Sequence, residues 1–191
     1  MAAVRLRADA ERNRVALLAA AREVFSEHGL DASLDEIARR AGVGNATLYR
    51  RFPTRQDLIA AVFADRKATQ VDLAERALQD SDPWSGFVGY VTGLCELQST
   101  NRGLGELLVT VNFDDDERIA QLRATAQRQS RELIRRAQEA GALRTDFDLP
   151  DLMLLLMANA GVIQRAPEPE AWRRQLALVL DGLAARRFRK T

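Results

Sequence analysis

Residues 33–63 constrain the fold of this chain more than any other stretch, because they contain two helix starts separated by one tight turn. Ser33 stands three residues before Glu36, the spacing of a capping box, which predicts that a helix begins here. The Gly-Val-Gly sequence at 42–44 predicts the end of that helix, since glycine accepts the left-handed backbone of a helix C-terminus. Asn45 is a favourable N-cap for a second, short helix. Together these signals predict a helix-turn-helix.

A longer helix follows the helix-turn-helix, and another precedes it. Pro53 ends the second short helix, and Thr54 with Asp57 supplies the cap of a helix that we expect over residues 54–79. Upstream, apolar residues recur at steps of three and four between residues 9 and 28, which predicts the first helix of a three-helix domain. Residues 1–8 are predicted to form a basic arm that is disordered when free.

Arginines gather in this part of the chain. Five arginines and no acidic residue lie between residues 37 and 56. Residues 1–56 carry ten arginines and seven acidic residues, a net charge of +3, whereas the other 18 basic and 20 acidic residues give −2. A locally positive surface on a nearly neutral protein predicts contact with DNA phosphates. The alternative is an ordinary helical hairpin with a solvated basic face.

The second short helix is the predicted DNA-reading helix, because its small and polar side chains allow a close approach to base edges. Asn45 and Thr47 are the candidates for groove contacts, and Arg50 is the candidate for a guanine or a phosphate. Ala46 is small enough to lie against base edges. The candidates for contacts with the DNA backbone are Ser33, Tyr49, Arg51 and Arg55.

These landmarks resemble the N-terminal domain of TetR-type transcriptional regulators. The matching pieces are Phe25 and Gly29 near the end of the first helix, the IARRAGV turn at 37–43 and the TLYRRFPTRQDL run at 47–58. The resemblance covers roughly the first third of the chain, and it implies an all-helical dimer that represses transcription and releases its operator when a small ligand binds. Many members have Ser-Lys-Gly or Ser-Arg-Ala where this chain has Gly-Asn-Ala at 44–46, so the usual basic residue is absent there.

The rest of the chain predicts further helices and no strands. We expect an all-α fold of about nine helices, with an N-terminal three-helix helix-turn-helix DNA-binding domain at 1–56 and a helical-bundle ligand-binding and dimerisation domain at 57–191. The boundary is placed inside the helix over 54–79, since no Gly-, Ser- or Pro-rich linker occurs nearby. The later helices are expected over residues 83–99, 101–112, 117–140, 148–164 and 170–187.

Aromatic, methionine and amide side chains of the second domain are candidates for a small-molecule site. In helical bundles such sites form between facing helices. Asn159 lies in the middle of an apolar helix and needs hydrogen-bond partners, which a ligand can supply. The alternative for each of these side chains is ordinary core packing. The candidates are Trp84, Phe87, Tyr90, Phe113, Met153, Met157 and Asn159.

The last two helices predict a partner surface. The helix over 148–164 is apolar over most of its circumference and the helix over 170–187 carries a broad apolar stripe, so burial on more than one side is expected. A second copy of the chain is the natural partner, and the family resemblance implies a four-helix bundle of these two helices from each subunit. The alternative is a core within one chain. The candidate interface residues are Leu152, Leu156, Trp172, Leu176, Val179, Leu180 and Leu183.

The sequence disfavours an enzyme, a metal site and a membrane protein. The single histidine, His28, has no cysteine or acidic residue at metal-ligand spacing, and the acidic run at 114–117 is interpreted as a helix N-terminus. There is no Cys/His pair and no Gly-rich phosphate loop, so we expect no cofactor and no catalysis. The longest apolar run, residues 152–163, is too short to span a bilayer.

The expected location is the cytoplasm. The chain has one cysteine, Cys95, so it cannot form an intramolecular disulfide, and no signal peptide is recognised. The leading hypothesis is therefore a TetR-like DNA-binding regulator, a repressor that binds a palindromic operator as a homodimer and is released by an unknown small-molecule effector. The alternative is a dimeric DNA-binding regulator whose C-terminal body only dimerises and binds no ligand.

Overall fold

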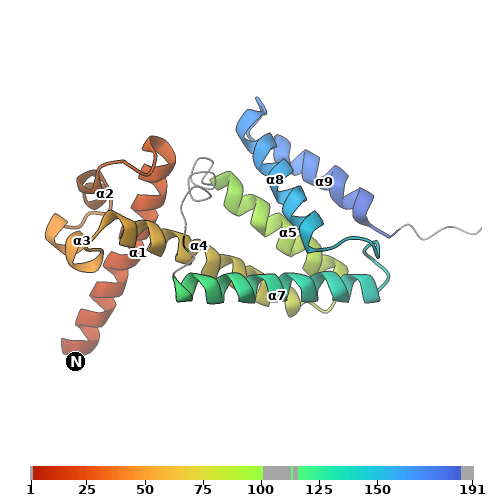
Figure 1. The fold of residues 1–191 in the computed structure, drawn as a ribbon, viewed down its shortest axis with the longest axis horizontal. Coiled ribbons are helices and arrows are strands. Elements are labelled where there is room, and N and C mark those ends of the chain that lie inside the picture. The colour runs from red at the N-terminus through yellow and green to blue at the C-terminus, as the bar shows by residue number, and fades with distance from the viewer. Residues whose placement is uncertain (1, 101–112, 114–115, 186–191) are drawn as a thin grey trace, which may run out of the picture. The chain divides into compact units, whose positions relative to one another are not determined.

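The computed structural model describes residues 2–100, 113 and 116–185, with side chains from residue 8 onward. The predicted all-α class is confirmed: eight helices occur in these residues, and the only β feature among them is an isolated bridge. None of these helices combines the length and apolar character needed to cross a membrane. The helices are α1 (Ala2–His28), α2 (Leu34–Arg40), α3 (Asn45–Arg51), α4 (Arg55–Leu78), α5 (Pro83–Thr100), α7 (Glu117–Glu139), α8 (Leu149–Arg165) and α9 (Ala171–Leu183) (Figure 1).

The chain divides into two compact units, with a boundary between Arg66 and Lys67, inside α4. The helix-turn-helix unit comprises residues 2–66 and, among the later described residues, 113 and 116–119. The bundle unit comprises the described residues from 67 to 100 and from 120 to 185. The predicted short helix at 101–112 lies outside the described residues.

The helix-turn-helix unit is built on α1, which packs against α2, while α2 packs against α3 (Figure 1). One apolar side of each helix is buried, as the helical spacing of these residues requires. The first part of α4 completes this core, and Phe63 of α4 stacks on Phe113 with their ring centroids 4.5 Å apart. Fully buried side chains of the unit are Leu17, Val24, Phe25, Ile37, Leu48, Leu58 and Val62.

Two local motifs end and begin helices where the sequence predicts them. Gly42 has φ +68° and donates its N–H to Arg39 O, while Val43 N–H bonds Ala38 O, so α2 ends in a Schellman motif. At the start of α4, Thr54 and Asp57 cap each other: Thr54 Oγ1 accepts from Asp57 N, and the Asp57 carboxylate accepts from Thr54 N.

Two boundaries differ from the predictions. The first helix begins earlier than predicted, because α1 starts at Ala2 and includes the basic arm; residues 2–8 are mostly alanine, leucine and arginine, which favour a helix. The last helix ends at Leu183 and does not continue to residue 187. Ala184 leaves the helix with ψ 129° and pairs with Leu143 in the isolated bridge, which redirects the backbone.

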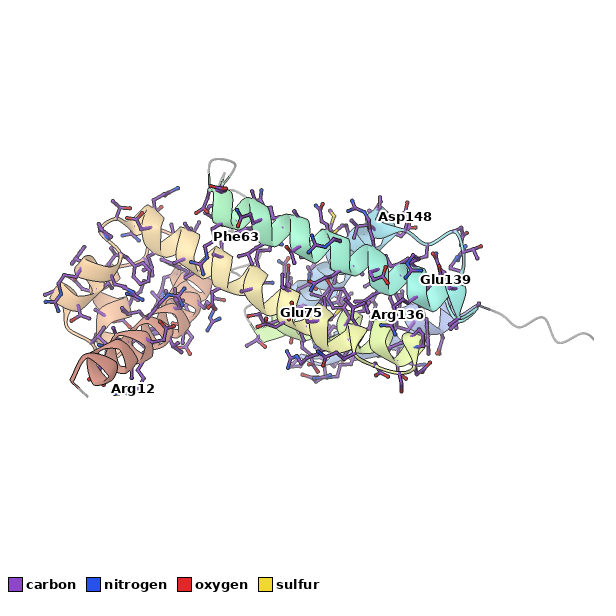
Figure 2. All side chains as sticks on the ribbon, turned by 90° about the horizontal axis from the view of Figure 1, so that it is seen from below. Arg12, Phe63, Glu75, Arg136, Glu139 and Asp148 are labelled. Carbon is purple, nitrogen blue, oxygen red and sulfur yellow. The ribbon has the colours of Figure 1, made fainter. Side chains whose placement is uncertain are left out.

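The bundle unit is held together by α4, α5, α7, α8 and α9 around one apolar core. Close approach of α4 and α5 depends on two glycines: a Cβ on Gly86 would lie 2.5 Å from Ala77 O, and one on Gly93 would lie 2.9 Å from a Leu73 methyl. Helix α7 is tied to the end of α4 by Arg136, whose guanidinium donates to Leu78 O and to Asp80 O (Figure 2).

The helix starts and ends in the bundle unit follow short-range signals. Asp148 and Asp151 form a capping box at the start of α8. Asp116, the third residue of the acidic run, accepts a hydrogen bond from Ile119 N at the start of α7, where α7 still belongs to the helix-turn-helix unit; residues 114–115 lie outside the described residues. Gly141, with φ +67°, ends α7 close to the predicted end of the helix at residue 140.

Candidate nucleic-acid interface

Helix α3 is almost entirely exposed, which is the property that a DNA-reading helix needs. Leu48 is its only buried residue and anchors the helix to the core. The N-cap is Gly44, so the prediction of Asn45 as the cap is wrong; the Gly44 backbone is extended and its carbonyl accepts from Thr47 N at 2.8 Å. Thr47 is half-buried. The exposed side chains are Asn45, Ala46, Tyr49, Arg50 and Arg51.

The Asn45 side chain makes a hydrogen bond to α2. Its amide nitrogen Nδ2 donates to Asp35 Oδ1 at 2.7 Å. Arg50 makes the second polar contact within this surface, since its guanidinium donates to Thr47 Oγ1 at 3.2 Å. Each contact fixes the direction of a side chain that is predicted from the sequence to contact DNA.

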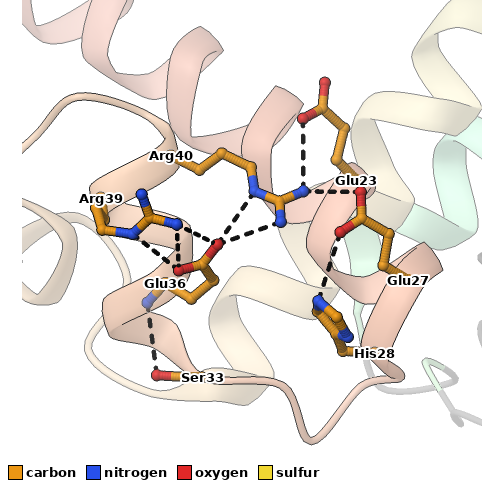
Figure 3. Close-up of polar contacts among 7 residues, drawn as sticks. All are labelled: Glu23, Glu27, His28, Ser33, Glu36, Arg39 and Arg40. Carbon is orange, nitrogen blue, oxygen red and sulfur yellow. Dashed lines mark hydrogen bonds and ion pairs between the residues drawn. The ribbon is translucent and has the colours of Figure 1, made fainter.

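Two arginines of α2 are paired with acidic side chains, and one of them, Arg40, ties α2 to α1. Arg40 donates to Glu27 of α1 at 2.8 Å and to Glu36 at 3.2 Å, so it connects the two helices (Figure 3). Arg39 donates to both oxygens of Glu36 at 2.8 Å. The predicted capping box is formed in one direction only: Ser33 Oγ accepts from Glu36 N at 3.5 Å, while the Glu36 carboxylate binds the arginines.

These ion pairs shift the acidities of the groups involved. The hydrogen bond from Arg40 lowers the pKa of Glu27, and the hydrogen bond from Arg39, reinforced by Arg40, lowers the pKa of Glu36. The same contacts, with Glu27 first, raise the pKa of Arg40. The carboxylates therefore favour the folded helix-turn-helix unit in their ionised form.

Arg55 has a structural contact that the sequence did not predict. Its guanidinium donates to Leu30 O at 2.9 Å and to Ala32 O at 2.5 Å, in the turn between α1 and α2. The side chain is half-buried and bridges α4 to that turn. Buried or half-buried carbonyls need such donors, so this arginine closes the helix-turn-helix unit.

A groove of about 340 Å³ runs between α1 and α3. Arg51 lies at its edge, 3.7 Å from Glu11 of α1. Sequence reasoning missed the residues that α1 contributes, although four of them recur at the three- and four-residue steps of one helix face. The lining residues are Asp9, Ala10, Asn13, Arg14 and Leu17 from α1, and Thr47, Arg50 and Arg51 from α3.

The candidate ligand residues do not form one site. Phe87 and Tyr90 are buried in the core of the bundle unit, where Tyr90 Oη lies 2.8 Å from Ser130 Oγ. Asn159 is also fully buried and donates to Gln98 Oε1 at 3.0 Å, whereas Trp84 is half-buried. Phe113 belongs to the helix-turn-helix unit. Met153 and Met157 are 52% and 68% exposed.

The candidate interface residues face the interior of their own chain. Leu152, Trp172, Leu176, Leu180 and Leu183 are buried in the bundle core, and Leu156 and Val179 pack against it half-buried. A different set of large apolar side chains is exposed on the same two helices. These are Met153, Leu154 and Met157 on α8 and Leu178 on α9.

No group of histidine, cysteine and acidic residues suited to a metal ion occurs in the described part of the chain. His28 is the last residue of α1 and lies 3.4 Å from Glu27. Cys95 is fully buried, and burial raises the pKa of its thiol to about 12.

The fold and the exposed α3 define this chain as a helix-turn-helix protein. Residues 17–62 match the family described as bacterial regulatory proteins, tetR family. Residues 82–185 match the C-terminal domain described as transcriptional regulator SbtR-like. The HTH-type transcriptional repressor LfrR of Mycolicibacterium smegmatis is 30% identical over 178 residues, which cover 92% of this chain and 79% of that protein.

Solved structures of TetR regulators are also similar to this chain over most of its length. A TetR regulatory protein from Mycobacterium vanbaalenii is 34% identical, with a TM-score of 0.72, and the match covers 94% of this chain and 99% of that one. The TetR regulator SCO0520 from Streptomyces coelicolor is 34% identical, with a TM-score of 0.73 and coverages of 91% and 99%. The chain belongs to the TetR family of bacterial transcription regulators, which are DNA-binding proteins and not enzymes. The predicted resemblance is confirmed.

Proposed function

We propose that this chain is a cytoplasmic repressor that reads an operator with α3. The observation that carries the proposal is the exposure of α3: Leu48 is its only buried residue, so the exposed Asn45 and Arg50 and the half-buried Thr47 can face a major groove. Repression is inferred from LfrR, a relative named as a repressor and 30% identical to this chain.

Phosphate contacts come from the surroundings of α3 in this proposal. Arg50 and Arg51 are exposed at its C-terminal end, Tyr49 is 46% exposed, and Ser33 is exposed at the start of α2. Arg55 is assigned to the structural contact with Leu30 and Ala32 and is withdrawn from the DNA-contact set. Such contacts release counterions, so binding weakens steeply as salt rises.

We further propose that the protein acts as a homodimer on a palindromic operator. The exposed apolar side chains of α8 and α9 support this, because large exposed apolar patches are typical of protein interfaces. The proposed contact residues are Met153, Leu154, Met157 and Leu178, which replace the buried set expected from the sequence.

A small-molecule effector is the last part of the proposal. Buried polar atoms usually have partners, yet Asn159 Oδ1 and Trp172 Nε1 are buried with no hydrogen-bond partner among the described residues. A ligand that supplies those partners in one conformation of the bundle would shift DNA affinity by its differential binding. The alternative is a bundle unit that only dimerises and binds no ligand. It is supported by the contact of Phe87 with Phe147 and by the contact of Tyr90 with Ser130, because these two candidate ligand residues already have partners in the core.

The test is selection of bound duplexes from a random DNA pool with the full chain, followed by titration against salt. We expect a palindromic motif and an affinity that falls roughly tenfold or more between 50 and 200 mM salt. Failure to recover any motif would contradict operator reading.

The homodimer is tested with two substitutions of Leu154. Leu154→Glu should give a monomer in sedimentation and lose operator affinity, while Leu154→Met should not. A thermal shift with any metabolite would argue against the ligand-free alternative.

A further inference from the structure

The contact between Asp35 and Asn45 joins the two helices of the helix-turn-helix at the surface proposed to meet DNA. Asp35 is the second residue of α2 and Asn45 the first residue of α3, and both side chains are exposed. The Asn45 amide nitrogen lies 2.7 Å from Asp35 Oδ1. A carboxylate only accepts hydrogen bonds, so the amide must present its NH₂ group to Asp35. This contact therefore removes the usual ambiguity between the two ends of an asparagine amide.

The amide keeps a complete recognition edge after this bond is made. Its nitrogen has two hydrogens, and one suffices for Asp35. The remaining N–H and the carbonyl oxygen form the donor–acceptor pair that adenine complements in the major groove, through N7 and the exocyclic N6 amine. A free asparagine side chain would have to give up rotational freedom to present this edge, whereas Asn45 is already held.

An acidic side chain on a surface that meets DNA lowers the affinity for DNA. The Asp35 carboxylate repels the phosphates of every sequence, so it lowers non-specific affinity. Its neighbour Glu36 is engaged by Arg39 and Arg40, but Asp35 instead receives the Asn45 amide. A group that weakens all DNA binding while it orients one reading side chain raises the ratio of specific to non-specific affinity.

We propose that Asp35 is a positioning residue that sets the base preference of Asn45, and that Asn45 reads an adenine in each half-site. Asn45 Oδ1 accepts from adenine N6, Asn45 Nδ2 donates to adenine N7, and the other Nδ2 hydrogen stays with Asp35. The proposal rests on the proposed operator reading by α3.

The experiment compares five full-length proteins in the same duplex selection and in titrations with operator and random-sequence DNA. They are the wild type, Asn45→Ala, Asp35→Ala, Asp35→Asn and the control Asp31→Ala. Asp31 is an exposed acid of the same unit, so its removal changes the charge equally. All substituted side chains are exposed, and matching circular dichroism melts will verify that each variant is folded.

We expect Asn45→Ala to reduce the preference for adenine at one symmetric pair of positions by roughly 5- to 150-fold. Asp35→Ala should reduce the preference at those same positions while it increases affinity for random DNA. Asp35→Asn keeps an acceptor without the charge, so it should retain the preference and still bind random DNA more tightly. Asp31→Ala should raise affinity for all sequences without changing the preference.

The outcomes separate this inference from the proposed function. If the wild type selects a motif and Asp35→Ala keeps its full preference, Asp35 is only a surface acid and the inference fails while operator reading stands. An unchanged motif for Asn45→Ala would likewise overturn it. If the wild type selects no motif, operator reading itself fails, and the positioning role fails with it.

Discussion

Each of the two units of this protein has its own apolar core, and the additional contacts between helices differ from one unit to the other. In the helix-turn-helix unit, charged side chains bridge the helices: Arg40 joins α2 to α1, and Arg55 joins α4 to the turn between them. In the bundle unit, the helices are held together by an apolar core around Trp172 and by close contacts at glycines between α4 and α5. Helix α3 buries only Leu48, whereas the bundle unit buries a large apolar core and still exposes Met153, Leu154, Met157 and Leu178 on α8 and α9. Carboxylates whose pKa is lowered by a hydrogen bond from an arginine occur in both units: Glu27 and Glu36 in the helix-turn-helix unit, and Glu132 and Asp146 in the bundle unit.

The largest effect is expected from Trp172→Ala. Trp172 is 1% exposed, and removal of a buried tryptophan leaves a cavity that costs about 3–5 kcal/mol of unfolding free energy. Urea unfolding followed by the fluorescence of Trp84 measures the bundle unit alone, since both tryptophans lie there. Arg174→Ala is the control on the same helix, because Arg174 is exposed and its loss should change folding little. Equal effects of the two changes would contradict the distinction between core and surface on α9.

A smaller but localised effect is expected from Arg55→Ala. Two backbone carbonyls lose a charged donor, which costs about 1.5–3 kcal/mol. Hydrogen exchange should quicken in α2 and α3, while the tryptophan signal of the bundle keeps its urea midpoint. The matched change Arg50→Ala should weaken DNA binding and leave exchange unaltered. If Arg55→Ala weakened DNA binding without faster exchange, Arg55 would return to the DNA-contact set.

Gly42→Ala tests the turn of the helix-turn-helix. The φ of +68° at Gly42 strains any residue with a Cβ, so we expect a loss of about 1 kcal/mol. Gly44→Ala is the control, because Gly44 has φ −72° and open space around its Cα. Thermal melts followed by circular dichroism should show a lower midpoint for the first change only. A similar fall for Gly44→Ala would mean that the turn tolerates no side chain at either position.

The smallest effect is a pH dependence of the helix-turn-helix unit that depends on the ion pairs of α2. Folding lowers the pKa of Glu27 and of Glu36 below the ordinary 4.5, so their stabilisation is present above 4.5 and is lost as pH falls through the lowered pKa values of the folded state. Amide exchange in α2 should therefore quicken as pH decreases from about 5 to about 3, after correction for intrinsic rates. Glu36→Gln should flatten this dependence, and Glu75→Gln, an exposed change in the bundle unit, should not. An identical profile for Glu36→Gln would exclude the ion pairs as its source.

Sequence reasoning succeeded where the interacting residues are near neighbours along the chain. The Thr54–Asp57 cap and the Gly42 motif use partners three to five positions apart, so their residue types and spacing are sufficient. It missed the partner of Asn45 ten positions away and those of Arg55 more than twenty positions away. The packing of α3 on α2 brings Asn45 to Asp35, and the position of α4 brings Arg55 to the turn between α1 and α2.

The bundle helices show a second limit of sequence patterns. A helix that is apolar nearly all round can be predicted to be buried on two sides, but its periodicity does not say which side faces its own chain. In α8 the structure buries Leu152 and Leu155 and exposes Leu154 and Met157. The choice is made by α5 and α9, which pack on α8. An interface inferred from the apolar pattern of a helix therefore selects residues that are buried in the core of their own chain.

The burial of Cys95 has a practical consequence for spectroscopy. This thiol is the only one in the chain, it has no exposed surface, and its pKa of about 12 leaves almost no thiolate at neutral pH. Maleimide dyes and nitroxide labels will therefore leave the native protein unmodified. A cysteine introduced at the exposed Gln56 would be labelled alone, without first deleting a native thiol. Two such labels in a dimer would report the separation of its DNA-reading heads directly, with and without an effector.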